Sequence, residues 1–334
     1  MKTIFALCLL LTVAGNAESH FTETSHVQMM LPGWMTDELS ALQRAQQEKK
    51  PLVVAFLGDG WCPWSEKWAQ EMLGKTEFVE LLDGHAVLLH VAMAQDNPGR
   101  MSEIREKYQV YHCPQMIAYA KDGEEIGRIE YAPMDPKQYA TQIFQLIGQF
   151  NEIRSYIDHP EETNDIEQLQ RLYQNAQKLS SSFYKDKLLQ LGLERDSGTF
   201  FLLEKYGTLI RQLKLKNPLV QQMRKKVLER DPKNAHGTHL SLAILEFEKL
   251  SRALKSKESP DKAAIPLVSY LQKYGKKDKE NLWKVELMLA HFYFSKNRID
   301  TALSHAKVSH ERAPDAAKGE IADLIEYFSQ KTQH

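Results

Sequence analysis

Two kinds of hydrophobic pattern divide the chain into two parts. Residues 52–57 form a continuous apolar run without polar alternation, which is typical of a central strand covered on both faces. Short apolar runs and amphipathic segments then alternate as far as residue 150. From residue 151 onward, apolar residues recur at helical spacing and the strand signals disappear. The pattern therefore predicts an α/β domain followed by an all-α domain.

The first part contains alternating helix and strand signals. A helix over residues 36–49 is expected to begin at Thr36 as its cap and to carry Leu39, Leu42 and Ala45 on its apolar side. After the strand over 52–57, the expected elements are helices over 66–73, 77–82, 101–108 and 136–150, and strands over 85–91, 115–120 and 125–131. From residue 52 to residue 150, and without the short helix over 77–82, the order of these elements is βαβαββα.

The second part consists of segments with helical periodicity. They cover residues 165–179, 181–191, 197–212, 218–229, 237–253, 263–273, 282–296, 299–313 and 316–330. Near the end, small and aromatic residues are spaced as in the 34-residue tetratricopeptide repeat, namely Ala290, Tyr293, Ala302, Ala306 and Pro314. We expect helical hairpins of the tetratricopeptide type, and a plain helical bundle is the alternative.

The N-terminus has the pattern of a secretory signal peptide. Lys2 supplies a positive charge, residues 4–13 are almost entirely apolar, and small residues follow up to Ala17. We expect cleavage after Ala17, which would remove Cys8. The apolar run is too short to span a bilayer, and no later stretch is apolar enough to do so. We therefore expect a periplasmic or secreted protein without a membrane span after cleavage.

The expected domain organisation follows from these patterns. It consists of a signal peptide over 1–17, a lead-in over 18–33, an α/β domain over 34–150, a linker over 151–160 and a helical domain over 161–330.

The composition and the distribution of charge bear on whether the protein binds nucleic acid. The chain of 334 residues is 43% hydrophobic and 26% charged, with a net charge of −1. These values are ordinary for a globular protein, and the basic residues are spread along the chain rather than gathered on one segment. We therefore expect no nucleic-acid partner.

The candidate chemistry lies in the stretch Asp59–Ser65, which joins the apolar strand to the next helix. Cys62 stands where that helix begins, and the backbone N–H groups and the dipole there favour an anion. A thiol so placed has a lowered pKa, and the thiolate is the reactive form. A buried apolar cysteine is the alternative. The helix-start position favours Cys62 as a nucleophile.

This arrangement resembles the active site of the thioredoxin superfamily. The residues that carry the resemblance are Trp61–Pro63 between strand and helix, Pro114 before a strand, and the turn Asp122–Gly123. The resemblance covers residues 34–150. It implies a thioredoxin-like fold, with a central mixed sheet flanked by helices. It also implies that Pro114 is cis, faces Cys62 and positions the substrate backbone. Trp61 would then bind substrate, and Trp64 and Tyr111 would form part of an apolar rim on which substrate docks. The alternative for Trp64 and Tyr111 is that they are ordinary surface aromatics.

Two residues depart from the family pattern. Ser65 stands where the second cysteine of a Cys-x-x-Cys motif is usual, and it can hydrogen-bond to the Cys62 thiolate but cannot resolve a mixed disulfide. Phe56 stands where many thioredoxins carry a buried acid that helps to move protons. These departures weaken an argument for fast general disulfide reduction.

Cys113 precedes Pro114 and would lie close to Cys62 if the resemblance holds. Three interpretations remain open: a substitute resolving thiol, a resting disulfide that protects Cys62, or a residue that fills space. His112 is adjacent, but no metal-binding spacing supports a site, so we expect no metal.

The sequence thus predicts an exported thiol–disulfide oxidoreductase of the isomerase or reductase type. Cys62 would attack the disulfides of exported proteins, with Ser65 and Cys113 in supporting roles and with no dissociable cofactor. The helical domain carries no evident chemistry and would bind a protein partner or dimerise. The alternative is a periplasmic chaperone or adaptor, in which the helical domain binds partners and Cys62 only tethers them.

Overall fold

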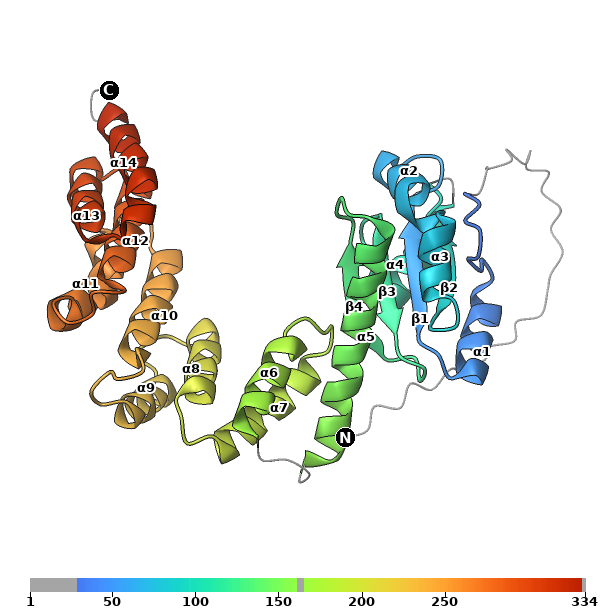
Figure 1. The fold of residues 1–334 in the computed structure, drawn as a ribbon, viewed down its shortest axis with the longest axis horizontal. Coiled ribbons are helices and arrows are strands. Elements are labelled where there is room, and N and C mark those ends of the chain that lie inside the picture. The colour runs from blue at the N-terminus through green and yellow to red at the C-terminus, as the bar shows by residue number, and fades with distance from the viewer. Residues whose placement is uncertain (1–28, 96, 161–164, 332–334) are drawn as a thin grey trace. The chain divides into compact units, whose positions relative to one another are not determined.

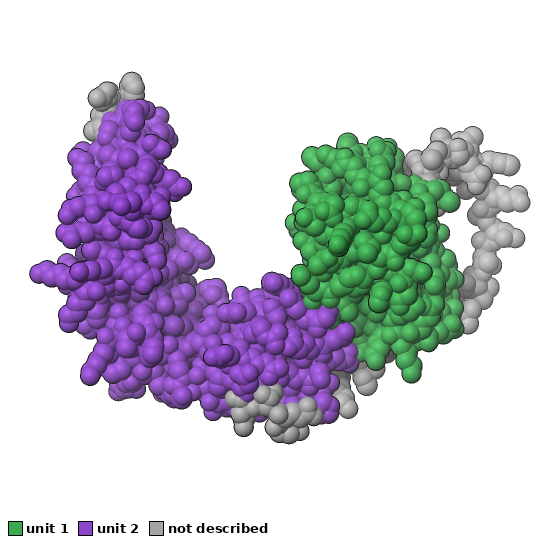
Figure 2. Space-filling view, in the orientation of Figure 1, with its two compact units in different colours: residues 1–147 green, residues 148–334 purple. Residues whose placement is uncertain are grey.

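The computed structural model describes residues 29–95, 97–160 and 165–331 (Figure 1). The expected signal peptide, its cleavage site at Ala17 and most of the lead-in lie outside the described residues. The chain forms two compact units, residues 1–147 and 148–334 (Figure 2). Among the described residues, no helix has the length and apolar character needed to cross a membrane.

The first unit is built on a four-stranded mixed sheet. Its strands are β1 (Leu52–Leu57), β2 (Val87–Ala92), β3 (Gln115–Tyr119) and β4 (Glu125–Glu130), in the spatial order β2-β1-β3-β4. β1 pairs in parallel with β2 and antiparallel with β3. All six residues of β1 are buried, so the prediction of a central strand covered on both faces is confirmed.

Helices cover both faces of this sheet. They are α1 (Glu38–Glu48), α2 (Pro63–Trp68), the π-helical turn η1 (Ala69–Leu73), α3 (Thr76–Leu82), α4 (Pro98–Tyr108) and α5 (Pro136–Asp158). Val53, Ala55 and Leu57 face the core made with α2, η1, α3 and α5, whereas alternate strand residues face α1 and α4. Because successive side chains of a strand point to opposite faces of the sheet, the core consists of two layers, one on each face.

The start of α1 differs from the prediction, and its buried side differs at Leu39 only, since Ala45 is buried and Leu42 packs against the core as expected. Asp37, rather than Thr36, is the cap, and its carboxylate accepts a hydrogen bond from the Ser40 N–H at 2.8 Å. Ala41 and Ala45 face the sheet, while Leu39 is 63% exposed. The small side chains of Ala41 and Ala45, at positions i and i+4, let the helix pack close to the sheet. This orientation places Leu39 on the solvent side, contrary to the prediction.

α5 extends beyond its predicted end at Phe150 and continues to Asp158, through most of the segment expected as a linker. Residues 151–158 contain neither glycine nor proline, so nothing in them stops a helix before Pro160. Phe150 and Ile153 are buried, which gives this extension an apolar side of its own.

In the described residues 165–331 of the second unit, all regular elements are helices joined by turns. Its helices are α6 (Ile166–Ala176), α7 (Ser182–Arg195), α8 (Phe200–Gln212), α9 (Pro218–Arg230), α10 (Thr238–Ala253), α11 (Asp261–Tyr274), α12 (Leu282–Ser295), α13 (Ile299–Arg312) and α14 (Asp315–Gln330). Each one matches a segment predicted from periodicity, within a few residues at its ends. The all-helical prediction for this part is confirmed.

Successive helices in this unit pack as neighbours, as in the pairs α6–α7, α8–α9, α10–α11 and α12–α13. Four of the small and aromatic residues noted in the sequence, Ala290, Tyr293, Ala302 and Ala306, are buried in one cluster with α11 and α14. The small side chains therefore lie where α12 and α13 meet.

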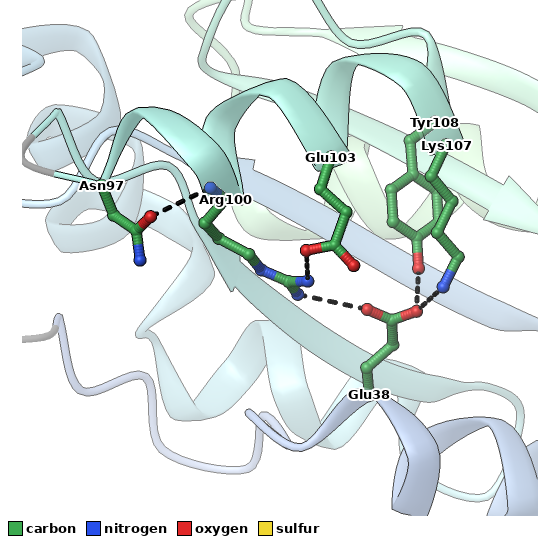
Figure 3. Close-up of polar contacts among 6 residues, drawn as sticks. All are labelled: Glu38, Asn97, Arg100, Glu103, Lys107 and Tyr108. Carbon is green, nitrogen blue, oxygen red and sulfur yellow. Dashed lines mark hydrogen bonds and ion pairs between the residues drawn. The ribbon is translucent and has the colours of Figure 1, made fainter. Parts of the chain in front are cut away.

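A polar cluster joins α1 to α4 at the edge of the first unit (Figure 3). Glu38 accepts hydrogen bonds from Lys107 and Tyr108, and Arg100 approaches its other oxygen at 3.3 Å. Burial raises the pKa of Glu38, but these hydrogen bonds outweigh burial and leave it below its ordinary value. The charged form of Glu38 is thus stabilised in the folded protein.

Replacement of Glu38 with glutamine is expected to lower the free energy of unfolding by about 1–2 kcal/mol at pH 7, because charge-assisted hydrogen bonds to a half-buried group are lost. A carboxyl with a depressed folded-state pKa stabilises above its ordinary value of 4.5 and loses that contribution as pH falls below it. Urea unfolding at several pH values will show a smaller acid dependence in the variant.

The matched control for this prediction is Glu103→Gln. Glu103 is exposed and contacts Arg100 in the same cluster (Figure 3), so its loss should change stability by less than about 0.5 kcal/mol. Equal effects of the two substitutions would contradict the prediction for Glu38.

Candidate active site

Cys62 lies in the loop between β1 and α2, at the cap position of α2. Pro63 occupies the first turn, where its missing N–H costs no hydrogen bond. The carbonyl oxygen of Gly58 accepts the N–H groups of Trp61 at 3.4 Å and of Cys62 at 3.0 Å, which closes the loop into a tight turn. The predicted position of Cys62 at a helix start is therefore confirmed.

The surroundings of Cys62 lower its pKa. Cys62 is 7% exposed, and burial by itself raises the pKa of a thiol. Hydrogen bonds from the hydroxyl and N–H of Ser65, from Cys113 and from the N–H of Trp64 outweigh burial, so the pKa lies below its ordinary value. A larger fraction of Cys62 is thus present as the reactive thiolate at neutral pH than for a free cysteine.

Ser65 links the helix to the preceding strand. It is fully buried, and its Oγ accepts a hydrogen bond from the Gly58 N–H at 2.9 Å. The same hydroxyl can donate its proton to the sulfur of Cys62, because a hydroxyl is both donor and acceptor. Ser65 therefore holds the loop and stabilises the thiolate with one oxygen atom.

Cys113 is brought to the same place from the loop before β3. The Cys113–Pro114 peptide bond is cis, as the family resemblance implied. The Cys62 sulfur lies 3.6 Å from the carbonyl oxygen of Cys113, and both cysteines are free thiols. Burial, together with the neighbouring Cys62, raises the pKa of Cys113 to about 11. The two thiols are thus adjacent and have pKa values shifted in opposite directions.

Gly58 makes this approach of the two cysteines possible. A Cβ atom at Gly58 would lie 2.6 Å from the Cβ of Cys62 and 2.8 Å from the Sγ of Cys113. It would also lie 2.8 Å from the Trp61 ring. Such distances are too short for non-bonded atoms, so the site requires glycine here. The role of Gly58 could not be predicted from the sequence, because it depends on a contact with a distant loop.

The aromatic residues expected to bind substrate differ in exposure. Trp64 is 57% exposed, and its ring lies 5.7 Å from that of Tyr131. Trp61 is half-buried, and its indole N–H donates to the carbonyl oxygen of Met93 at 2.5 Å. Tyr111 is exposed on the loop that leads to Pro114. Trp64 and Tyr111 are thus available to a substrate, whereas Trp61 also secures the loop.

A buried acid–base pair that the sequence analysis missed lies beside the loop. Asp59 Oδ1 is 3.1 Å from Nε2 of His90, and the other carboxylate oxygen accepts the Met29 N–H at 2.9 Å. Both side chains are buried, and Nδ1 of His90 has no hydrogen-bond partner among the described residues. Phe56, which replaces the usual buried acid, is fully buried. The buried acid near this site is thus Asp59.

We expect Ser65→Ala to shift the pH dependence of Cys62 alkylation toward higher pH. The hydroxyl lowers the thiol pKa, so its removal raises that pKa and leaves less thiolate at neutral pH. Alkylation by iodoacetamide, followed by mass spectrometry between pH 5 and 9, should be roughly fivefold slower near pH 7.

Ser102→Ala, on the exposed face of α4, is the control for this prediction and should leave the alkylation profile unchanged. An unchanged profile for Ser65→Ala as well would show that the hydroxyl does not stabilise the thiolate.

Comparisons with known proteins agree with this geometry. A family model described as a thioredoxin-like domain matches residues 40–147. The thioredoxin-related protein DsbJ of Chlamydia pneumoniae is 30% identical over 310 residues, which span 90% of this chain and 88% of DsbJ. The chain belongs to the thioredoxin-related family of DsbJ. The thioredoxin-like fold of the first part is thereby confirmed, and the similarity to DsbJ extends through most of the helical part.

This DsbJ-family chain is also similar to the disulfide bond reductase DsbH of Chlamydia pneumoniae. The two are 24% identical over 151 residues, which cover 42% of this chain and 90% of DsbH. A solved structure named DsbH oxidoreductase is 19% identical, covers 40% of this chain and 95% of its own, and gives a TM-score of 0.32.

Proposed function

We propose that the chain is an exported thiol–disulfide oxidoreductase, of the reductase or isomerase type, that acts on protein disulfides through Cys62. The observation that supports this most strongly is the Cys62 thiol, with its lowered pKa, at the start of α2 in a thioredoxin-like domain. The thiolate is the form that attacks a disulfide sulfur. A lowered pKa increases the fraction of Cys62 that is in this form at neutral pH.

The relatives support the same class of chemistry. One relative bears the name of a thioredoxin-related protein and another that of a disulfide bond reductase. The pattern of residues 1–17 supports export, and disulfides persist in the compartments that lie outside the cytosol. Exported proteins with thiols or disulfides are therefore the proposed substrates.

Substrate would dock on the exposed apolar rim beside the thiol. Trp64 and Tyr111 flank the site from α2 and from the loop before Pro114. In this proposal Pro114 positions the substrate backbone, and the half-buried Trp61 ring forms one side of the substrate-binding surface. Large aromatic side chains bury much apolar area for few rotatable bonds, which suits binding to varied polypeptides.

The helical unit supports a second candidate, an adaptor that binds partners and uses Cys62 only to tether them. α8 and α10 enclose a hollow of about 350 Å³ with Ile210 and Leu245 among its apolar lining. Arg211, Lys249 and Arg252 line the same hollow together with Glu248, which forms an ion pair with Arg252. A tetratricopeptide-like arrangement, which we propose for this unit, offers such surfaces to peptides.

Turnover distinguishes the two functions. Reduction of insulin will be followed with the full-length chain at a low molar ratio and dithiothreitol as the electron donor. An enzyme releases many equivalents of substrate thiol per mole of chain, above the rate with dithiothreitol alone. An adaptor releases one equivalent at most. Reactivation of scrambled ribonuclease without net reduction would assign the isomerase type.

A further inference from the structure

We propose that Cys113 resolves the mixed disulfide formed at Cys62, so that the two cysteines close an intrachain disulfide in each reductive cycle. This inference rests on the proposed function and deepens it, because it commits the site to net reduction. It also assigns to Cys113 the role that Ser65 cannot perform.

The geometry brings the two side chains to one point. The Cβ of Cys62 and the Sγ of Cys113 both lie within 2.8 Å of the position where a Cβ at Gly58 would stand. The Cβ of Cys62 and the Sγ of Cys113 are therefore separated by no more than twice this contact distance. A disulfide needs Cβ atoms about 3.5–4.5 Å apart. In this proposal the side chains rotate and the two loops adjust to reach that separation.

The Cys62 sulfur already contacts Cys113, since it lies 3.6 Å from the Cys113 carbonyl oxygen. The Cys113 side chain is among the groups that lower the pKa of Cys62. Ser65 lowers the pKa of each thiol. A residue that merely filled space before Pro114 would need neither contact.

The negative charge of the Cys62 thiolate makes Cys113 harder to deprotonate until Cys62 has formed the mixed disulfide. Burial is the main cause of the raised pKa of Cys113, followed by the negative charge of Cys62 and by the hydrogen bond to it. When Cys62 is bonded to a substrate sulfur, that charge and that hydrogen bond are lost. The Ser65 hydroxyl, which then has no Cys62 thiolate to donate to, can donate to Cys113 and favour its thiolate. Cys113 thus becomes easier to deprotonate once the mixed disulfide exists.

The reaction balances in two steps. The Cys62 thiolate attacks one substrate sulfur, the substrate S–S bond breaks, and the other substrate sulfur leaves as a thiolate that takes a proton from water. Cys113 then loses its proton to water and attacks the Cys62 sulfur, which releases the second substrate thiolate. The substrate gains two electrons and the cysteine pair loses two. An external dithiol reductant restores the pair.

The test compares wild type, Cys113→Ser and Cys113→Ala during reaction with a disulfide-bonded peptide. Acid quenching, trapping with N-ethylmaleimide and peptide mass spectrometry identify each bond by its sulfurs, so Cys8 does not interfere. In wild type we expect a Cys62–Cys113 bond. In both variants we expect the Cys62–substrate bond to persist at least about tenfold longer. His112→Ala, which alters the exposed neighbour, should behave like wild type.

The outcomes separate this inference from the proposed function. Mixed disulfides at Cys62 that are released equally fast with and without Cys113, and no bond between the two cysteines in wild type, would overturn the role of Cys113 alone. Absence of any mixed disulfide at Cys62 in both Cys113 variants, together with absence of a Cys62–Cys113 bond in wild type, would overturn both. The bond in wild type is measured without a substitution, so poor folding of a variant does not affect that result.

Discussion

Replacement of Cys62 with alanine is expected to reduce disulfide turnover to the rate of uncatalysed exchange. In the proposed reaction, Cys62 supplies the attacking sulfur, and the hydroxyl of Ser65 is no substitute because an alcohol at neutral pH does not open a disulfide. The measurement is insulin reduction by catalytic amounts of the variant with dithiothreitol present. The expected change is complete loss of the enhancement over dithiothreitol alone.

Folding and binding provide the controls for Cys62→Ala. Loss of one small, buried sulfur should cost about 1 kcal/mol of stability, which thermal unfolding will measure. If the variant turns over as fast as wild type, Cys62 is not the nucleophile. If turnover is absent in wild type as well, while partner binding persists in the variant, the adaptor function is supported instead.

Gly58→Ala is expected to slow the alkylation of Cys62 and disulfide turnover roughly tenfold to hundredfold. The new methyl group would overlap the Cβ of Cys62 and the sulfur of Cys113, and the first of these atoms cannot rotate away because it is fixed to the backbone. The loop must therefore move, at a cost of about 1–3 kcal/mol in stability. Alkylation kinetics, turnover and urea unfolding measure the three effects.

Gly148→Ala is the matched control for Gly58→Ala. Gly148 lies in the middle of α5, where an added Cβ meets no atom within 4 Å. Alanine should stabilise this helix by about 0.5–1 kcal/mol and leave the thiol chemistry unchanged. Normal Cys62 reactivity in Gly58→Ala would mean that the contacts at residue 58 relax without disturbing the site.

The sequence was sufficient to place Cys62, because its position depends on local structure. A buried strand, a short loop and a helix follow one another within a few residues, and hydrophobic periodicity reports each of them. The cis bond before Pro114 could be predicted from the family resemblance alone. The helices of the second unit could likewise be predicted from hydrophobic periodicity, because each helix is a local element.

What the sequence did not reveal depends on contacts between distant segments. Asp59 meets His90, and Glu38 meets three residues of α4, across separations that no local pattern records. The need for glycine at residue 58 follows from Cys113, which arrives from another loop. α5 is longer than its predicted range, because no helix-breaking residue lies between Phe150 and Asp158.

The hydrogen bond between Ser65 and Gly58 bears on how such a site can evolve. A cysteine at position 65 would create the familiar dithiol, yet its sulfur would replace a fully buried oxygen that accepts the Gly58 N–H at 2.9 Å. Sulfur is larger and accepts hydrogen bonds weakly. The single exchange would thus gain a thiol and weaken the turn that presents Cys62.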